Sequence, residues 1–254
     1  MAVFGADHLV APKLVSSFVP SWMPWRFFWG VFVGIALIAA AFSLATGIRA
    51  TLAAGWLGIM ILLFPILIYI PWWLAAPGDR FRQTLVLRDL VLSWCYLAFA
   101  ANPSHERASL GAAAALSPRI RSGIVVAARI VVAIAIGIYG IEQFSHPEAA
   151  PGIPPDGPNL VTTPTWVPGH AVFPYITGVL FVLGALGLLR ANLARRAAIL
   201  LGATSTVLIL AVYLPLTVAK ASDIDNGLNY MAIHFALSGA MLVLSGAIPK
   251  QAGQ

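Results

Sequence analysis

Several apolar runs in this chain are long enough to cross a lipid bilayer, and they limit the possible folds more than any other feature. A helix that crosses the hydrocarbon core needs about 18 or more mostly apolar residues. Charged residues make up 9% of the chain and apolar residues 60%, whereas soluble domains carry roughly 25% charged residues. No alternating, strand-like segment accompanies these runs. The sequence therefore predicts an all-α, polytopic transmembrane helical bundle.

The expected spans number about seven. Residues 1–9 are too short to cross a bilayer and form a stub ahead of the first span. Residues 10–26 form a connection rich in Pro and Trp, and Pro65 predicts a kink in the second span. The spans are expected at residues 27–46, 52–70, 84–101, 123–144, 170–189, 196–214 and 230–248.

An internal repeat relates the two halves of the chain. Residues 22–71 match residues 166–215 at a shift of 144 positions, without a gap, and twelve of the fifty pairs are identical. Several identities are Trp, Pro, Gly or Tyr, which matter more than shared Ala or Leu. This pattern indicates duplication of one membrane unit. Residues 1–9 match the end of the span at 123–144, so the first unit lacks most of its first helix. Either evolution trimmed that helix or the true start lies upstream of Met1.

The repeat and the basic residues predict the organisation and the orientation. The first unit covers residues 1–104, a cytoplasmic linker covers 105–122, and the second unit covers 123–254. Basic residues favour the cytoplasmic side, and loop 145–169 contains no Lys or Arg. We expect an inner-membrane protein with an external loop 145–169 and a cytoplasmic C-terminus. The net charge of +6 comes from scattered residues near helix ends, which fits lipid headgroups rather than nucleic acid. Homo-oligomerisation is left open.

Six ionisable residues are candidates for binding or proton transfer. Ionisable side chains are costly inside a membrane, and they usually face a bundle interior or a cavity. In the expected topology the six lie at one level, in the outer leaflet. One acid occupies the matching position in both units, which is the strongest functional signal of the chain. The candidates are Asp7, His8, Arg88, Asp89, Glu142 and His234.

Each candidate also has a structural interpretation. The two matching acids can tie helices together by pairing with Arg88 or Lys220. Arg88 and Asp89 are neighbours, so we expect them to point to different faces of their helix and to reach headgroup water. His234 can donate a hydrogen bond to a backbone carbonyl. The sequence alone leaves both interpretations open.

Tryptophans mark the expected membrane surfaces, because amphipathic rings concentrate at the headgroup level. A metal site is not expected, since no His-x-x-x-His or Glu-x-x-His pair occurs. The expected membrane anchors are Trp22, Trp25, Trp72, Trp73 and Trp166.

The order of these features resembles the DoxX/DoxD-like family of four-helix membrane proteins. The resemblance rests on Gly5-Ala6-Asp7-His8, the Pro- and Trp-containing segment 19–24, Gly34, the turn Gly47-Ile48-Arg49, the corner Tyr69-Ile70-Pro71, and Arg88 with Trp94. The second unit keeps Thr165-Trp166-Val167-Pro168 and Tyr213-Leu214-Pro215, but it has Gln143 in place of the histidine, and Asn229 and His234 in place of the Arg-led fourth helix.

The resemblance implies an accessory component of a membrane redox system, with redox partner subunits and a quinone as the candidate cofactor. We expect a quinone or lipid pocket near the outer leaflet, between Asp7, His8, Trp22, Arg88 and Asp89. Two other functions are open. Duplication favours a small-solute transporter, although no acid lies at the membrane midplane, where transporters usually bind substrate. The third possibility is a non-catalytic scaffold subunit.

Overall fold

The computed structural model of the protein describes residues 1–102, 116–155, 162–219 and 228–249. Within these ranges the chain consists of helices and loops, and an isolated β-bridge joins Ala149 to Thr162. The all-α fold expected from the sequence is therefore confirmed. Lys220, most of linker 105–122 and part of loop 145–169 lie outside the described residues.

The first half of the chain contains a stub, two long helices and a third helix that carries charge. The residues expected as a plain connection include a short helix, α2, because Pro12 fits the first turn, where no backbone N–H is needed. Pro65 opens a π-helical turn where a kink was expected. The elements are α1 (Ala2–Val10), α2 (Pro12–Phe18), α3 (Arg26–Thr46), α4 (Ala50–Phe64), the π-helical η1 (Pro65–Tyr69), α5 (Ile70–Leu74) and α6 (Arg80–Ala100).

The second half begins with a long helix, α7, of 28 residues. Its third span is again interrupted by a π-helical turn, which begins 144 residues after η1. The elements are α7 (Pro118–Ser145), α8 (Phe173–Leu189), α9 (Ala194–Leu208), the π-helical η3 (Ile209–Tyr213), α10 (Leu214–Ala219) and α11 (Leu228–Ala247).

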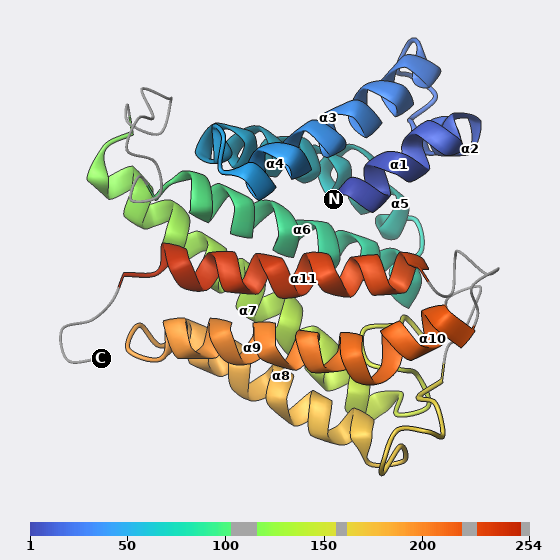
Figure 1. Ribbon diagram of the computed structural model, residues 1–254, viewed down its shortest axis with the longest axis vertical. Coiled ribbons are helices and arrows are strands. Elements are labelled where there is room, and N and C mark those ends of the chain that lie inside the picture. The colour runs from blue at the N-terminus through green and yellow to red at the C-terminus, as the bar shows by residue number, and fades with distance from the viewer. Residues whose placement is uncertain (103–115, 156–161, 220–227, 250–254) are drawn as a thin grey trace.

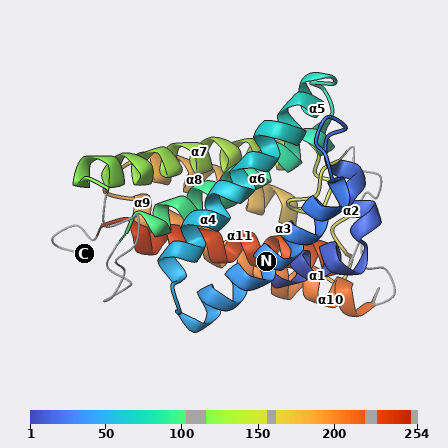
Figure 2. The same ribbon diagram turned by 90° about the horizontal axis from the view of Figure 1, so that it is seen from above.

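Two central helices, α6 and α11, lie side by side in the middle of the bundle (Figure 1). Helices α3 and α4 lie on one side of this pair, and α8 and α9 lie on the other. Both views place α2 and α10 at one end of the molecule, and the last residues of α11 at the opposite end (Figure 2). We call these the α10 end and the C-terminal end.

Five helical stretches are long and apolar enough to cross a membrane: Arg26–Thr46, Ala50–Leu74, Pro118–Ser145, Ala194–Ala219 and Leu228–Ala247. The chain is therefore compatible with an integral membrane protein. The other two expected spans correspond to α8, which is apolar but has only 17 residues, and to α6, which carries Arg88 and Asp89. Burial differs between the halves: 22% of the most apolar stretch of Arg26–Thr46 and 28% of that of Ala50–Leu74 are buried, against 56% for Ala194–Ala219.

Two helices begin earlier than the apolar pattern indicates, because polar caps extend them. The side chain of Asp79 accepts a hydrogen bond from the Arg82 backbone N–H at 3.0 Å, so α6 begins at Arg80 rather than at residue 84. The side chain of Ser117 accepts from the Ile120 N–H, and α7 begins at Pro118 rather than at residue 123. Such caps satisfy backbone groups outside the apolar run.

Helices α7 and α8 touch through glycine backbones. A Cβ atom added to Gly140 would lie 2.8 Å from Cγ2 of Val182 and 3.0 Å from the carbonyl oxygen of Gly178. Small residues allow this close approach, which is a common way to join helices in a membrane.

We expect Gly140→Ala to lower the free energy of unfolding by about 1–3 kcal/mol, because the added methyl group overpacks a contact with immobile backbone. Unfolding by SDS in mixed micelles measures this. Gly123→Ala is the matched control: it lies on the same helix, and no atom lies within 4 Å of an added Cβ. Equal stabilities of the two variants would contradict the close contact.

Candidate functional site

A buried ion pair lies on α6. Nε of Arg88 donates to Oδ1 of Asp89 at 2.7 Å, and only 4% of Asp89 is exposed. The expectation that both side chains reach headgroup water is wrong for Asp89, which is buried. Neighbours leave a helix in different directions, but the long arginine side chain folds back to Asp89, because an unpaired charge is costly inside the bundle. Arg88 also interacts with the hydroxyl of Tyr69 on η1. The pair therefore links α6 to the π-helical turn of the first half.

A second ion pair joins α6 to α7. Glu142, buried on α7, accepts from Nη1 of Arg80 at 3.3 Å. Of the partners expected for Glu142, Arg88 is engaged by Asp89, and Lys220 lies outside the described residues. Near this pair, the hydroxyl of Tyr139 donates to the carbonyl oxygen of Thr84 at 3.0 Å. These contacts fasten the first half to the second at the α10 end.

His234 lies on α11 with both ring nitrogens facing carbonyl oxygens. Nδ1 lies 2.8 Å from the oxygen of Tyr230, and Nε2 lies 3.1 Å from the oxygen of Pro151. The imidazole stacks on Tyr213 of η3, with ring centroids 3.8 Å apart, and the Tyr213 hydroxyl donates to the same Pro151 oxygen. His234 therefore fastens the loop after α7 to the bundle. This is the carbonyl contact that the structural interpretation expected.

The other two candidates lie on the stub helix. Asp7 is half-buried on α1. Nδ1 of His8 lies 2.6 Å from the carbonyl oxygen of Phe4, one turn earlier. The side chain of His8 emerges beside Gly34 of α3: a Cβ added to that glycine would lie 2.8 Å from the His8 Cβ. Thus α1 holds His8 against the middle of α3.

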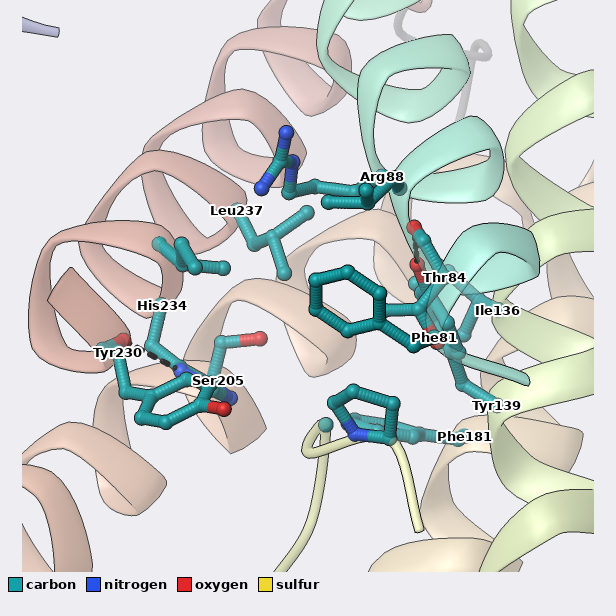
Figure 3. Close-up of a pocket in the computed structure, with 14 residues that line it drawn as sticks. Phe81, Thr84, Arg88, Ile136, Tyr139, Phe181, Ser205, Tyr230, His234 and Leu237 are labelled. Carbon is teal, nitrogen blue, oxygen red and sulfur yellow. Dashed lines mark hydrogen bonds between the residues drawn. The ribbon is translucent and has the colours of Figure 1, made fainter. Parts of the chain in front are cut away.

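A small cavity lies between the two halves, and Figure 3 shows its lining. Its volume is about 80 Å³, which is room for a few water molecules. Arg88 and His234, from the two central helices, both line it, together with the polar residues Thr84, Tyr139, Ser205 and Tyr230. The cavity brings two of the six candidates to one space, which is too small for a lipid-soluble ligand.

A much larger apolar depression lies between α3 and α4, and we call it the α3–α4 groove. Its volume is about 870 Å³, within the range of ligand pockets. His8 and Tyr69 line it toward the α10 end, and Arg49 lines it at the turn between the two helices. Aliphatic and aromatic side chains form the walls, among them Val33, Ala36, Ala40, Leu57, Met60 and Phe64.

The single pocket expected from the sequence is therefore divided. His8 lies in the α3–α4 groove and Arg88 in the small cavity. Asp7, Trp22 and Asp89 are not among the described residues that line either space. Tyr69, not chosen from the sequence, links the two, because it lines the groove and touches Arg88. Its place in the Tyr69-Ile70-Pro71 corner was the available signal.

The expected tryptophan anchors differ in their contacts. Trp22 and Trp25 are exposed, and Trp25 has a left-handed backbone with φ of 55°. Nε1 of Trp166 donates to the Ala211 carbonyl oxygen of η3 at 3.2 Å. Arg82 stacks on the Trp72 ring, 4.5 Å from its centroid, and Nε1 of Trp73 donates to Pro77.

No group of three or more His, Cys, Asp or Glu side chains that could hold a metal ion occurs in the described part of the chain. Searches against protein-family models, curated proteins and solved structures find no match to this chain.

Proposed function

We propose that this chain is an integral membrane protein built from two DoxX-like four-helix units, with seven spans and a stub. It binds a quinone in the first unit and serves as an accessory component of a membrane redox system. We place it in the inner membrane, with loop 145–169 outside and the C-terminus in the cytoplasm.

Three geometric coincidences support the duplication. The π-helical turns η1 and η3 begin 144 residues apart, at Pro65 and Ile209. The left-handed residues Trp25 and Gly169 are also 144 apart. The approach of Gly140 to the Gly178 carbonyl is repeated by Gly5, whose added Cβ would lie 2.8 Å from the Gly34 oxygen. The first two details recur at the shift of 144 residues; in the third, Gly34 lies 144 residues before Gly178 and Gly5 lies 135 residues before Gly140, as in the match of residues 1–9 to the end of α7.

The observation that carries the quinone proposal is the polar end of the α3–α4 groove. A quinone has an apolar tail and two carbonyl oxygens that accept hydrogen bonds. The groove offers an apolar channel, and His8 and Tyr69 are polar residues of its lining toward the α10 end. Tyr69 is held by Arg88, whose charge Asp89 balances. The Tyr69 hydroxyl can donate a hydrogen bond to one carbonyl. Reduction of the quinone takes up two electrons, which a partner subunit supplies, and two protons, which reach the two carbonyl oxygens from water through Tyr69 and His8.

The test is mass spectrometry of the protein extracted in native-membrane nanodiscs, with bound quinone and bound partner subunits measured together. We expect a stoichiometric quinone, and a loss of about two- to twelvefold in Tyr69→Phe, because one hydrogen bond contributes about 0.5–1.5 kcal/mol. Tyr175→Phe is the matched control, because Tyr175 is an exposed residue of α8.

Absence of quinone from the wild-type protein would overturn the proposal. A reproducible partner protein without any bound small molecule would favour the scaffold function instead. Solute uptake by proteoliposomes would favour the transporter.

A further inference from the structure

The end of the α3–α4 groove opposite to His8 and Tyr69 has features that the proposed quinone site does not use. Arg49 lines this end, in the turn between α3 and α4. It is the only Lys or Arg among the described residues that line the groove, and no described lining residue is acidic. Arg49 is exposed and takes part in no ion pair within the described ranges.

The matching helices of the second half show what closes such a groove. In α8, a Cβ added to Gly184 would lie 2.4 Å from Cδ2 of Leu201, and one added to Gly187 would lie 2.7 Å from Cβ of Ala197. Real Cβ atoms do not approach other atoms so closely. The separation of α8 and α9 therefore requires glycine at both positions.

The first half has larger residues at the same places. The positions 144 residues before the two glycines are Ala40 and Ser43, while the opposing Leu57 and Ala53 are identical to their counterparts. All four of these residues line the groove. The side chains of Ala40 and Ser43 prevent α3 and α4 from packing as closely as α8 and α9. Two substitutions thus account for a groove in one half and a closed contact in the other.

We propose that this end of the α3–α4 groove binds an anionic phospholipid, with one acyl chain between Ala40 and Leu57 and the phosphate at Arg49. Charge complementarity selects this occupant. An acyl chain matches the apolar walls, while an unbalanced arginine at the end of those walls matches a headgroup with net negative charge. The first backbone N–H groups of α4, which begins at Ala50, point to the same side as the headgroup and favour an anion.

The position of the groove fits lipid entry from the membrane. Only 22% of the most apolar stretch of Arg26–Thr46 and 28% of that of Ala50–Leu74 are buried, so the walls of the groove are among the least covered parts of the expected spans. An acyl chain can enter the groove laterally from the bilayer, without passing through the protein. The bound acyl chain would then pack between α3 and α4, where α8 and α9 of the second half pack directly on each other through Gly184 and Gly187.

Photolabelling of the full chain tests the proposal. The purified protein is placed in quinone-free nanodiscs that contain phosphatidylglycerol or phosphatidylcholine, each with a diazirine in one acyl chain. After irradiation, adducts are mapped by peptide mass spectrometry. We expect adducts in α3 and α4 along the groove, with the anionic lipid favoured about fivefold, as one interfacial arginine predicts. Arg49→Gln should reduce the yield of the anionic lipid to that of phosphatidylcholine.

A pair of matched variants tests the groove itself. Ala40→Leu fills it and should remove most of the adducts. Ala45→Leu makes the same change at an exposed position of α3 that does not line the groove, and it should leave them unchanged. The two substitutions differ only in the face of α3 that they enlarge.

Three outcomes would overturn the proposal. One is labelling spread evenly over lipid-facing residues such as Leu183 and Leu186, which are equally exposed at 56%. Another is equal labelling by both lipids. The third is a groove shielded from lipid by a second copy or another protein. Because the nanodiscs contain no quinone, these results are independent of the proposed redox function.

Discussion

We expect Asp89→Ala to lower the free energy of unfolding by about 3–5 kcal/mol, the usual effect of removing one member of a buried ion pair. Asp89 is 4% exposed and lies 2.7 Å from Nε of Arg88. Without the carboxylate, the positive charge of Arg88 loses the anion that balances it. SDS-induced unfolding in mixed micelles measures the loss.

Two further variants separate charge from packing. In Arg88→Met/Asp89→Leu no charge remains, and replacement of a buried pair by apolar residues is often close to neutral. We therefore expect the double variant to be more stable than Asp89→Ala. Glu148→Ala is the surface control, because the exposed Glu148 forms a surface ion pair with His146, and such pairs contribute about 0–1 kcal/mol. If Asp89→Ala behaves like Glu148→Ala, the ion pair is not a stabilising element.

Gly152→Ala should have a similarly large effect, a loss of about 2–5 kcal/mol from two independent causes. Gly152 has φ of +85°, a conformation in which a side chain costs about 1–2 kcal/mol. An added Cβ would also lie 2.6 Å from Nε2 of His234. The ring cannot move aside, because Tyr213 stacks on one face and both nitrogens face carbonyl oxygens. Overpacking of this kind adds about 1–3 kcal/mol.

Gly169→Ala is the matched control for the backbone contribution. Gly169 has φ of +67°, but the nearest atom to an added Cβ is Cγ2 of Val172 at 3.3 Å. The difference between the two variants measures the clash with His234 alone, again by SDS unfolding. Measured relative to His234→Ala alone, Gly152→Ala in that background should cost only the backbone contribution. Equal losses for Gly152→Ala and Gly169→Ala would show that the His234 ring yields.

The positions of the helices could be predicted from the sequence, because a spanning run of apolar residues is a local property. The first span was expected at 27–46, and α3 covers Arg26–Thr46. The boundaries of α6 and α7 could not be found in this way, because Asp79 and Ser117 extend these helices beyond the apolar run.

The contacts of the candidate residues could be predicted only in part. The rule that neighbours on a helix point to different faces describes only the direction in which each side chain leaves the backbone. It does not predict where a long side chain ends, and the Arg88 guanidinium returns to Asp89. The partner of Glu142 depends on how α6 packs on α7, since Arg80 lies 62 residues away. Neither contact can be predicted from the local sequence.

The α3–α4 groove could not be predicted from hydropathy. Helices α3 and α4 are as apolar as their counterparts, so hydropathy does not distinguish an open pair from a closed pair. The distinguishing signal lies in two aligned positions, where Ala40 and Ser43 replace Gly184 and Gly187. A comparison of residues 22–71 with residues 166–215 for side-chain volume, rather than for identity, would have shown it.

The π-helical turns have a consequence for the phase of the helices that contain them. A π turn holds one residue more than an α turn, and one residue rotates an α-helix by about 100°. Everything after Tyr69 or Tyr213 therefore faces a different neighbour than an uninterrupted helix would. In each of these two spans, the side chains that face the neighbouring helices before the π-helical turn and those that do so after it lie on different sides of the helix. Deletion of a single residue within η1 would remove this rotation and turn α5 and its aromatic corner away from α6.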